Sequence, residues 1–227
     1  MNWIAVAVDG PSGAGKSSVC KAVAKRLNYT YIDTGAMYRA IGYWMIQHNI
    51  NLADECAILE QLNNFHLSFN DDNAICINGE CVESFIRSEE VSYGASCVAK
   101  LAGVRQYCVK AQRDMVKVCH CIMDGRDIGS VVLPNAQVKI YLDASVGVRA
   151  KRRYLQNQEK GIACDLANIE NDIKQRDMQD MNRKNSPLIR LDSAYYLNSS
   201  SLTFEQTVNE MIKVIEETMG KGGIEHD

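Results

Sequence analysis

A short glycine-rich segment limits the possible folds of this chain more than any other part of it. The apolar run 3–8 is followed directly by Gly10-Pro11-Ser12-Gly13-Ala14-Gly15-Lys16-Ser17-Ser18. A glycine, four residues, Gly-Lys and then Ser is typical of a phosphate-binding loop between a buried strand and a helix. The glycines let the backbone curl around phosphate oxygens, the exposed amides donate to them, Lys16 adds a positive charge, and the Ser17 hydroxyl can ligate Mg²⁺. The segment therefore predicts a nucleoside triphosphate site.

The alternative is an ordinary glycine-rich turn between a strand and a helix. The residues after the loop favour the phosphate site, because apolar side chains recur there at the spacing of an amphipathic helix. Those side chains are Val19, Ala22, Val23, Ala24 and Leu27. The positive end of such a helix would point at the same phosphate groups.

Length and charge exclude several classes of protein. With 227 residues, the chain can form one sizeable core with small insertions, but not two large domains. The formal net charge of −3 argues against a nucleic-acid-binding protein. No apolar run approaches the roughly 20 residues that a membrane span requires, and the N-terminus lacks a secretion signal. We expect a cytoplasmic protein that binds neither nucleic acid nor membrane.

The nine cysteines are an odd number without a C-x-x-C pair, which favours a reducing compartment over a disulfide framework. Cys119-His120-Cys121 is the one cluster that suggests a metal site. In an extended strand, however, the cysteines point to one face and the histidine to the other. Buried thiols in a core strand are therefore the preferred interpretation.

The pattern along the chain alternates between short apolar runs and amphipathic segments. The predicted strands cover 3–9, 31–33, 118–123, 138–142 and 195–197. The predicted helices cover 16–27, 36–47, 53–65, 89–118, the charged stretch 149–183, and 203–219. Such alternation predicts an α/β fold with a parallel sheet. Between these parts, 66–69, 74–77 and 80–82 flank turn residues at 70–73 and 78–79, which predicts a small antiparallel meander.

Polar and charged side chains form five clusters, three of which lie at the carboxyl ends of predicted strands. The clusters are Asp33 to Arg39; Ser96 with Arg105; Asp124-Gly125-Arg126-Asp127; Arg149, Arg152 and Arg153; and Arg176, Asp180 and Arg183. In open α/β sheets, ligands bind at the carboxyl ends of the strands. Taken alone, these clusters could equally be turns with local ion pairs or solvated helix faces.

Taken together, the motifs make the chain similar to the bacterial cytidylate kinase family. The resemblance covers nearly the whole chain and rests on residues 10–18, 33–39 and 124–127, on the spacing of Arg176, Asp180 and Arg183, and on Pro187-Leu188. It implies a P-loop NTPase three-layer fold with a parallel central sheet, in a single domain over 1–227. It further implies a core (1–50, 98–148 and 186–220), a small antiparallel monophosphate-binding insert (51–97), a helical lid (149–185) and a loose tail (221–227).

The family implies transfer of a phosphoryl group from ATP, with Mg²⁺, to CMP or dCMP by a monomer. Catalytic roles would fall to Lys16, Arg39, Arg126 and Arg183. ATP would contact residues 10–18, Arg152 and Arg153. CMP would contact Thr34, Arg39, Ser96, Arg105, Arg126, Asp127, Arg176, Asp180 and Arg183. Gln179 and Met181 depart from the family pattern, because other members can carry arginine there.

Physical reasoning supports these roles, since phosphoryl transfer depends on cations that align two phosphates and neutralise the developing charge. The residues by themselves leave two alternative functions open. One is a kinase for another small acceptor, such as UMP or a hydroxylated metabolite. The other is a guanine-nucleotide switch, which is disfavoured because the chain has no Asn-Lys-x-Asp motif.

Overall fold

The structure is a computed structural model that describes residues 3–70, 72–117 and 119–222. The chain divides into two compact units, which we describe separately. Met1–Tyr31 and Cys119–Asp227 form the first, here called the sheet unit, and Ile32–Val118 form the second, here called the helical unit.

The sheet unit is built on a five-stranded sheet with the order β2-β6-β1-β7-β8. The strands are β1 (Ala5–Asp9), β2 (Thr30–Asp33, which crosses into the helical unit), β6 (Cys121–Gly125), β7 (Val138–Asp143) and β8 (Tyr195–Asn198). The pairs β1–β6, β1–β7 and β7–β8 are parallel. Val6, Ala7 and Val8 are almost fully buried, as expected for a central strand covered on both faces.

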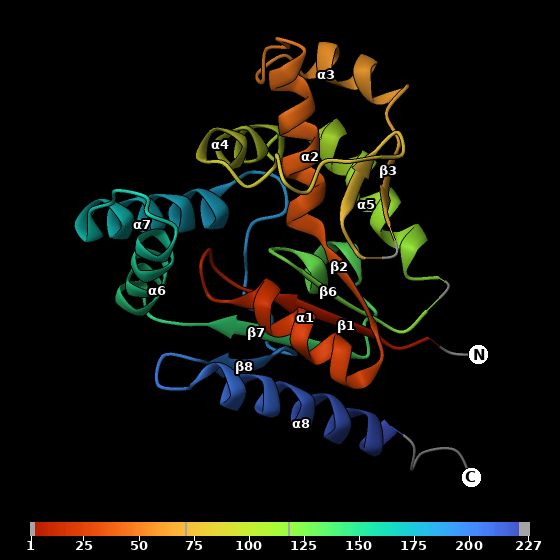
Figure 1. Cartoon of the computed structure of the whole chain (residues 1–227). Helices are drawn as coiled ribbons and strands as arrows, with labels where there is room; N and C mark the ends of the chain where they lie inside the picture. The colour runs from red at the N-terminus through yellow and green to blue at the C-terminus, as the bar shows by residue number, and fades with distance from the viewer. Residues whose placement is uncertain (1–2, 71, 118, 223–227) are drawn as a thin grey trace. The chain divides into compact units, whose positions relative to one another are not determined.

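Two helices cover one face of this sheet with a shared hydrophobic core (Figure 1). They are α1 (Lys16–Leu27) and α8 (Phe204–Gly222). Val19 and Val23 of α1 and Met211 of α8 are nearly inaccessible, and they pack in one cluster with Val6 and Ile140. The unit also contains the helices α6 (Val146–Glu159) and α7 (Leu166–Asn182) and the short π-helical turn η1 (Ile128–Val132).

The strand register brings three strand ends to one edge. Val8 lies opposite Asp124, and Asp9 lies opposite both Gly125 and Tyr141. The glycine-rich loop therefore leaves β1 at the edge where β6 delivers the Asp124–Asp127 segment.

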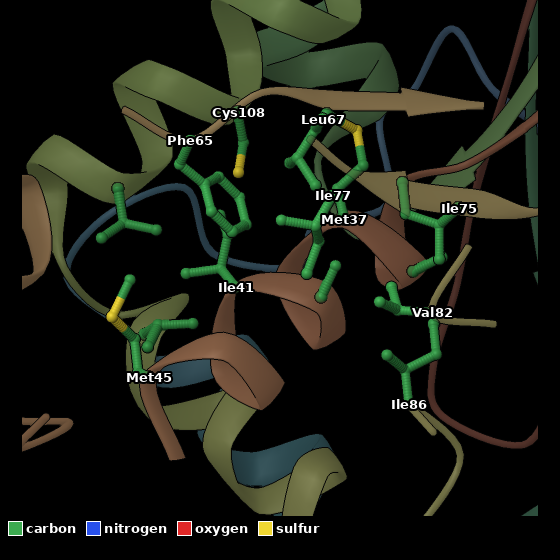
Figure 2. Packing of buried hydrophobic residues seen from close by; sticks show 14 of the residues in the cluster. Met37, Ile41, Met45, Phe65, Leu67, Ile75, Ile77, Val82, Ile86 and Cys108 are labelled. Atoms are coloured by element: carbon green, nitrogen blue, oxygen red, sulfur yellow. The ribbon is translucent and has the colours of Figure 1, made fainter. Parts of the chain in front are cut away.

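The helical unit has its own core, centred on α2 (Thr34–Gln47). Met37, Ile41 and Met45 are fully buried and recur at four-residue spacing, so they line one face of this helix (Figure 2). Around it lie α3 (Glu55–Leu62), α4 (Glu89–Val98), α5 (Ala102–Met115) and a small antiparallel sheet of β3 (Leu67–Phe69), β4 (Ile75–Ile77) and β5 (Glu80–Cys81).

Most predicted elements are present, with differences at their ends. The first and third core strands begin at Ala5 and Cys121, later than predicted, and the predicted helix 53–65 is shortened to Glu55–Leu62 behind an Asp54 cap. Two predictions of a single helical stretch are wrong, because each stretch is two helices. In 89–118 the chain turns between Val98 and Ala102, and in 149–183 it turns between Glu159 and Leu166.

The end of the chain also differs from the prediction. Helix α8 continues to Gly222, beyond the predicted start of the tail at residue 221, and residues 223–227 of that tail lie outside the described part of the chain. Residues 71 and 118, which fall in a predicted turn and a predicted strand, also lie outside it. Among the residues that are described, no helix is both long enough and apolar enough to span a membrane.

Candidate active site

The glycine-rich loop needs a glycine at its first position. Gly10 has φ 153°, and a Cβ there would lie 2.0 Å from the backbone oxygen of Leu142 in the neighbouring strand β7. Glycine alone fits this combination of backbone angle and close approach. The loop can therefore run along the ends of β1 and β7.

The loop delivers its amides to the N-terminus of α1. Gly15 occupies the cap position with φ 88°, and no side chain caps the helix. Side chains do cap six other helices, namely Asp33 for α2, Asp54 for α3, Ser88 for α4, Ser145 for α6, Asp165 for α7 and Thr203 for α8. The first amides of α1 thus retain donor capacity for an anion, which the positive end of the helix favours.

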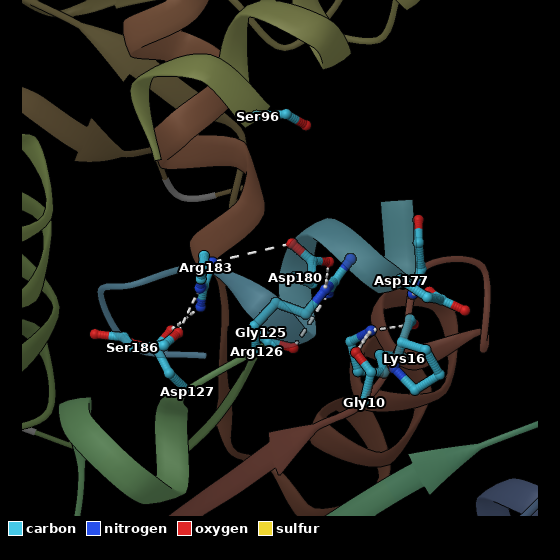
Figure 3. Close-up of polar contacts among 12 residues, drawn as sticks. Gly10, Lys16, Ser96, Gly125, Arg126, Asp127, Asp177, Asp180, Arg183 and Ser186 are labelled. Atoms are coloured by element: carbon cyan, nitrogen blue, oxygen red, sulfur yellow. Dashed lines mark hydrogen bonds and ion pairs between the residues drawn. The ribbon is translucent and has the colours of Figure 1, made fainter. Parts of the chain in front are cut away.

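Lys16 is buried at the start of α1 and reaches back over the loop. Its Nζ donates to the backbone oxygens of Gly10 at 2.7 Å and Pro11 at 2.8 Å (Figure 3). Burial, followed by the charge of Arg126, lowers the pKa of Lys16 to about 7. A phosphate group in contact with the amine would favour its charged form and raise this pKa again.

Ser17 meets a carboxylate from a distant part of the sequence. Its Oγ donates to Oδ2 of Asp124 at 3.0 Å, and the Tyr31 hydroxyl donates to Oδ1 of the same residue at 2.7 Å. Hydroxyl and carboxylate oxygens are the ligands that Mg²⁺ prefers, so this donor set fits that ion. Asp124 was not among the predicted site residues, although a carboxylate closing an apolar strand could have identified it.

Four predicted substrate residues lie together beside the end of β6. Arg126 Nε donates to Oδ2 of Asp180 at 2.6 Å, and Arg183 Nη2 donates to Oδ1 of Asp127 at 3.4 Å (Figure 3). Arg183 also lies 4.0 Å from Asp180. In the pair of Arg126 with Asp180, burial opposes the charged form of each side chain, but the attraction between them outweighs burial. The pKa of Asp180 is therefore lowered and that of Arg126 is raised.

Three further predicted site residues belong to the sheet unit and lie on the helices α6 and α7. Arg176 lies half-buried on α7. Arg152 donates to the backbone oxygen of Ser199 at 2.8 Å and to its hydroxyl at 3.3 Å, whereas Arg153 is exposed. In this structure Arg152 therefore anchors α6 to the segment that follows β8.

The helical unit carries the other four predicted residues. Thr34 is buried at the first position of α2, and Arg39 is half-buried, its Nη1 so near Gly35 that a Cβ on that glycine would approach it to 3.2 Å. Arg105 is buried on α5, its guanidinium 5.7 Å from the centre of the Tyr38 ring.

Ser96, the fourth of these residues, is half-buried on α4. Its hydroxyl donates to the backbone oxygen of Ser92 at 3.1 Å.

Asp9, which was not among the predicted site residues, supports the segment that carries Asp127. Its carboxylate accepts from the backbone N–H groups of Ile128 and Gly129, each at 2.8 Å. These amides open the π-helical turn η1, for which Asp127 is the cap residue. Burial raises the pKa of Asp9 to about 6 despite the two hydrogen bonds. The acidic residue at the end of the first apolar strand was the available signal.

A buried ion pair holds the loop to the two charged helices. Arg149 of α6 donates through Nη2 to Asp177 of α7 at 2.6 Å and through Nη1 to the backbone oxygen of Ser12 at 2.7 Å. Asp177 in turn accepts from the Ser12 amide at 3.3 Å. The backbone N–H and the backbone oxygen of Ser12 are thus both hydrogen-bonded to this ion pair. The side chains of Arg149 and Asp177 are 4% and 8% exposed.

The Cys119–Cys121 cluster is arranged around its histidine. Nδ1 of His120 accepts from the Ile4 amide at 2.9 Å, and the ring stacks on Tyr29 with centroids 5.3 Å apart. Strand β6 begins only at Cys121, which is fully buried as predicted. The prediction is wrong for Cys119, which lies before the strand and is half-buried. His120 therefore fastens the start of β1 to the start of β6.

Comparisons with known proteins give a consistent result. A family model described as cytidylate kinase matches residues 6–217. The cytidylate kinase of Geobacillus sp. (strain WCH70) is 44% identical over 222 residues, which cover 96% of this chain and 99% of the relative. That of Alkaliphilus oremlandii (strain OhILAs) is 44% identical over 216 residues, covering 95% and 99%.

Among solved structures, a gluconokinase from Sinorhizobium meliloti 1021 matches with a TM-score of 0.53 and 12% identity, covering 98% of each chain. At this identity the likeness shows the fold alone. Together with the five-stranded sheet and the separate three-stranded sheet of this chain, this likeness confirms the predicted P-loop fold.

Proposed function

Because the chain belongs to the cytidylate kinase family, we propose that it transfers the terminal phosphoryl group of ATP to a phosphate oxygen of CMP or dCMP. The bond between that group and ADP breaks, a bond to the acceptor phosphate forms, and CDP or dCDP is released with ADP. The observation that carries the proposal within this chain is the uncapped N-terminus of α1 behind the glycine-rich loop, with Lys16 and Ser17 as its first residues.

The loop would hold the triphosphate. Backbone N–H groups of residues 10–18, except Pro11, would donate to its oxygens, and the Lys16 amine would exchange the Gly10 and Pro11 oxygens for phosphate oxygens. Further contacts are proposed for Arg152 and Arg153, which requires Arg152 to leave its present partner Ser199.

Mg²⁺ is the proposed metal, held by the Ser17 hydroxyl together with Asp124, whose oxygens already lie 3.0 Å apart. Such an ion neutralises charge on the transferring group. Tyr31 would hold the second carboxylate oxygen of Asp124 in place.

The acceptor phosphate would be bound by Arg126, Arg183 and Arg39. A planar guanidinium presents two parallel N–H donors that match two phosphate oxygens in a fixed geometry, whereas the amine of lysine acts as a point charge. Arg126 and Arg183 are now neutralised by Asp180 and Asp127, so an incoming phosphate competes with carboxylates for guanidinium groups that are already ordered. No general base is needed, since the attacking phosphate is already an anion.

Base and sugar recognition complete the proposal. Asp127, Ser96 and Arg105 would read the cytosine edge, Arg176 and Asp180 would contact the ribose, and the Thr34 hydroxyl would face the substrate. An ionised Asp127 accepts from the amino group of cytosine but repels the carbonyl oxygen that uracil presents instead. A buried mismatch of this kind costs on the order of 2 to 4 kcal/mol.

We also propose the finer features that the family resemblance implied: a monomer in the cytoplasm, and a core, an insert over 51–97 and a lid over 149–185. The helical lid would contain α6 and α7, and the insert would contain α3, the small antiparallel sheet and α4.

A coupled assay of ADP formation with ATP, Mg²⁺ and a panel of CMP, dCMP and UMP tests the proposal. We expect rapid turnover with CMP and dCMP, slower turnover with UMP, and formation of CDP confirmed by chromatography. Preference for UMP or for a hydroxylated metabolite would identify a different small-molecule kinase. ATP or GTP hydrolysis that does not respond to CMP would favour a nucleotide switch and refute the proposal.

A further inference from the structure

Two cysteines face each other across the small sheet of the helical unit. Strands β4 and β5 form a hairpin, in which Cys76 lies directly opposite Cys81 and Ile77 opposite Glu80. Asn78 and Gly79 connect the strands with φ 50° and 88°. Positive angles at both central residues are those of a type I′ turn, which holds the register of a hairpin tightly.

The hydrogen-bond pattern fixes which kind of pair the cysteines form. Val82 N donates to the Ile75 oxygen at 3.0 Å, so residues 75 and 82 occupy a hydrogen-bonded position. Because such positions alternate along an antiparallel ladder, Cys76 and Cys81 occupy the non-hydrogen-bonded position, where Cα atoms are about 4.5 Å apart. Disulfides span Cα distances of about 4.4 to 6.8 Å, so these cysteines can be bridged with little backbone movement.

The two thiols also share one face of the hairpin. Ile75 and Ile77 enter the core of the helical unit (Figure 2), so the intervening Cys76 points to the opposite side. Cys76 is 4% exposed and its sulfur lies 3.6 Å from the Ala74 oxygen, whereas Cys81 is exposed. Burial, followed by the neighbouring Cys81 thiol, raises the pKa of Cys76. Cys81 is therefore the thiol that a reagent meets first.

We propose that Cys76 and Cys81 are a redox-active pair, which a low-molecular-weight disulfide such as oxidised glutathione converts to an intramolecular disulfide. The Cys81 thiolate attacks the reagent, forms a mixed disulfide and releases one thiolate. Cys76 then attacks the Cys81 sulfur and releases the second. The protein loses two electrons and two thiol protons, and both pass to the reagent, which leaves as two thiols.

The other cysteines separate this pair from general oxidation. Cys121 is fully buried, and burial raises its pKa to about 12, so it does not supply a thiolate. Cys56 is exposed in the first turn of α3 and does not belong to the β4–β5 hairpin. It is therefore an internal control for simple addition of glutathione.

The test treats the full-length folded protein with oxidised glutathione, quenches with acid and maps the cysteines by mass spectrometry. In the wild type we expect a Cys76–Cys81 disulfide lacking two hydrogens, while Cys56 carries glutathione. In Cys76→Ser, Cys81 should instead accumulate glutathione, because no resolving thiol remains. In Cys81→Ser, Cys76 should stay unmodified at reagent concentrations that modify Cys56.

Two results would overturn the proposal. One is a wild-type protein whose Cys81 keeps glutathione to the same extent as in Cys76→Ser. The other is a Cys81 that remains a free thiol while Cys56 reacts. Cys76→Ala serves as a second variant, and near-identical circular dichroism of each variant and the wild type shows that the hairpin is compared in folded protein. The test needs no nucleotide, so its outcome does not depend on the proposed kinase activity.

Discussion

The buried amine of Lys16 donates to two backbone oxygens of its own loop. Its two hydrogen bonds hold the loop closed on itself, and a bound phosphate would replace both partners. Lys16 therefore stabilises the loop when no phosphate is bound, and it would contact the phosphate in the proposed reaction.

We expect Lys16→Ala to lower kcat by about 100-fold or more, since preorganised charge at a transferring group contributes on this scale. Steady-state ADP formation measures the loss, and circular dichroism with thermal unfolding verifies that the fold persists. Wild-type turnover in this variant would refute the assignment of the loop.

Asp127 is the residue on which the proposed choice of base depends. In Asp127→Asn we expect kcat/KM for CMP to fall and the preference for CMP over UMP to narrow, because the amide no longer repels the uracil oxygen. The ratio of kcat/KM for CMP to kcat/KM for UMP measures the change in base preference alone, because loss of the contact with Arg183 at 3.4 Å affects both nucleotides alike. An unchanged ratio means that cytosine is recognised elsewhere.

Asp9 links stability to pH. Its pKa of about 6 in the fold exceeds the ordinary 3.8, so the folded state holds the proton more tightly than the unfolded chain. Its stabilising contribution is complete below about pH 4 and is lost as pH rises through about 6, with an upper limit of about 3 kcal/mol.

The unfolding free energy of the wild type minus that of Asp9→Asn should therefore decrease between about pH 4 and about pH 7. Urea titrations across this interval measure it. A difference that does not vary with pH would contradict the shift, and an NMR titration of the Asp9 carboxyl group checks it in the wild type alone.

At the scale of elements, α7 carries two acidic residues that face different parts of the site. Asp177 binds Arg149 and the Ser12 amide of the loop, whereas Asp180 binds Arg126 at the end of β6. They lie three positions apart on one helix, so they project from neighbouring parts of its surface. Helix α7 thereby connects the proposed triphosphate loop with a proposed acceptor arginine.

Replacing Asp177 by Asn leaves the buried Arg149 without its charged partner. We expect the unfolding free energy to fall by about 3 kcal/mol and KM for ATP to rise more than KM for CMP, because the Ser12 peptide loses support. Glu170→Gln is the matched control on the same helix: its pair with Lys174 is 38% and 56% exposed, so the change should stay below about 0.5 kcal/mol. Equal effects on the two KM values would reduce Asp177 to a purely structural role.

At the scale of the whole molecule, the proposed lid over 149–185 must open for nucleotides to enter and close to exclude water. We expect a nonhydrolysable ATP analogue and CMP together to slow tryptic cleavage within this segment. Cleavage after Lys213 in α8, outside the proposed lid, is the internal control. Identical rates within the segment with and without both nucleotides would contradict a moving lid.

Much of the fold could be predicted from local patterns. Helix α1 begins and ends where its spacing predicted, and β2, β7 and β8 lie within a residue of their predicted bounds. Each pattern reports on a short window of the chain, which explains why the breaks between α4 and α5 and between α6 and α7 were missed. Two consecutive amphipathic helices have the same local period as one long helix.

The sequence alone determined the phosphate-loop motif, the alternation of strands and helices, and the family, because these depend on residue order and short-range spacing. Only the tertiary structure decided which distant groups meet: Ser17 with Asp124, Asp9 with the amides of η1, and Arg149 with both Asp177 and Ser12. These partners are far apart along the chain, and their distances follow from strand register and helix packing. No local pattern encodes that geometry, since it depends on how remote segments close on one another.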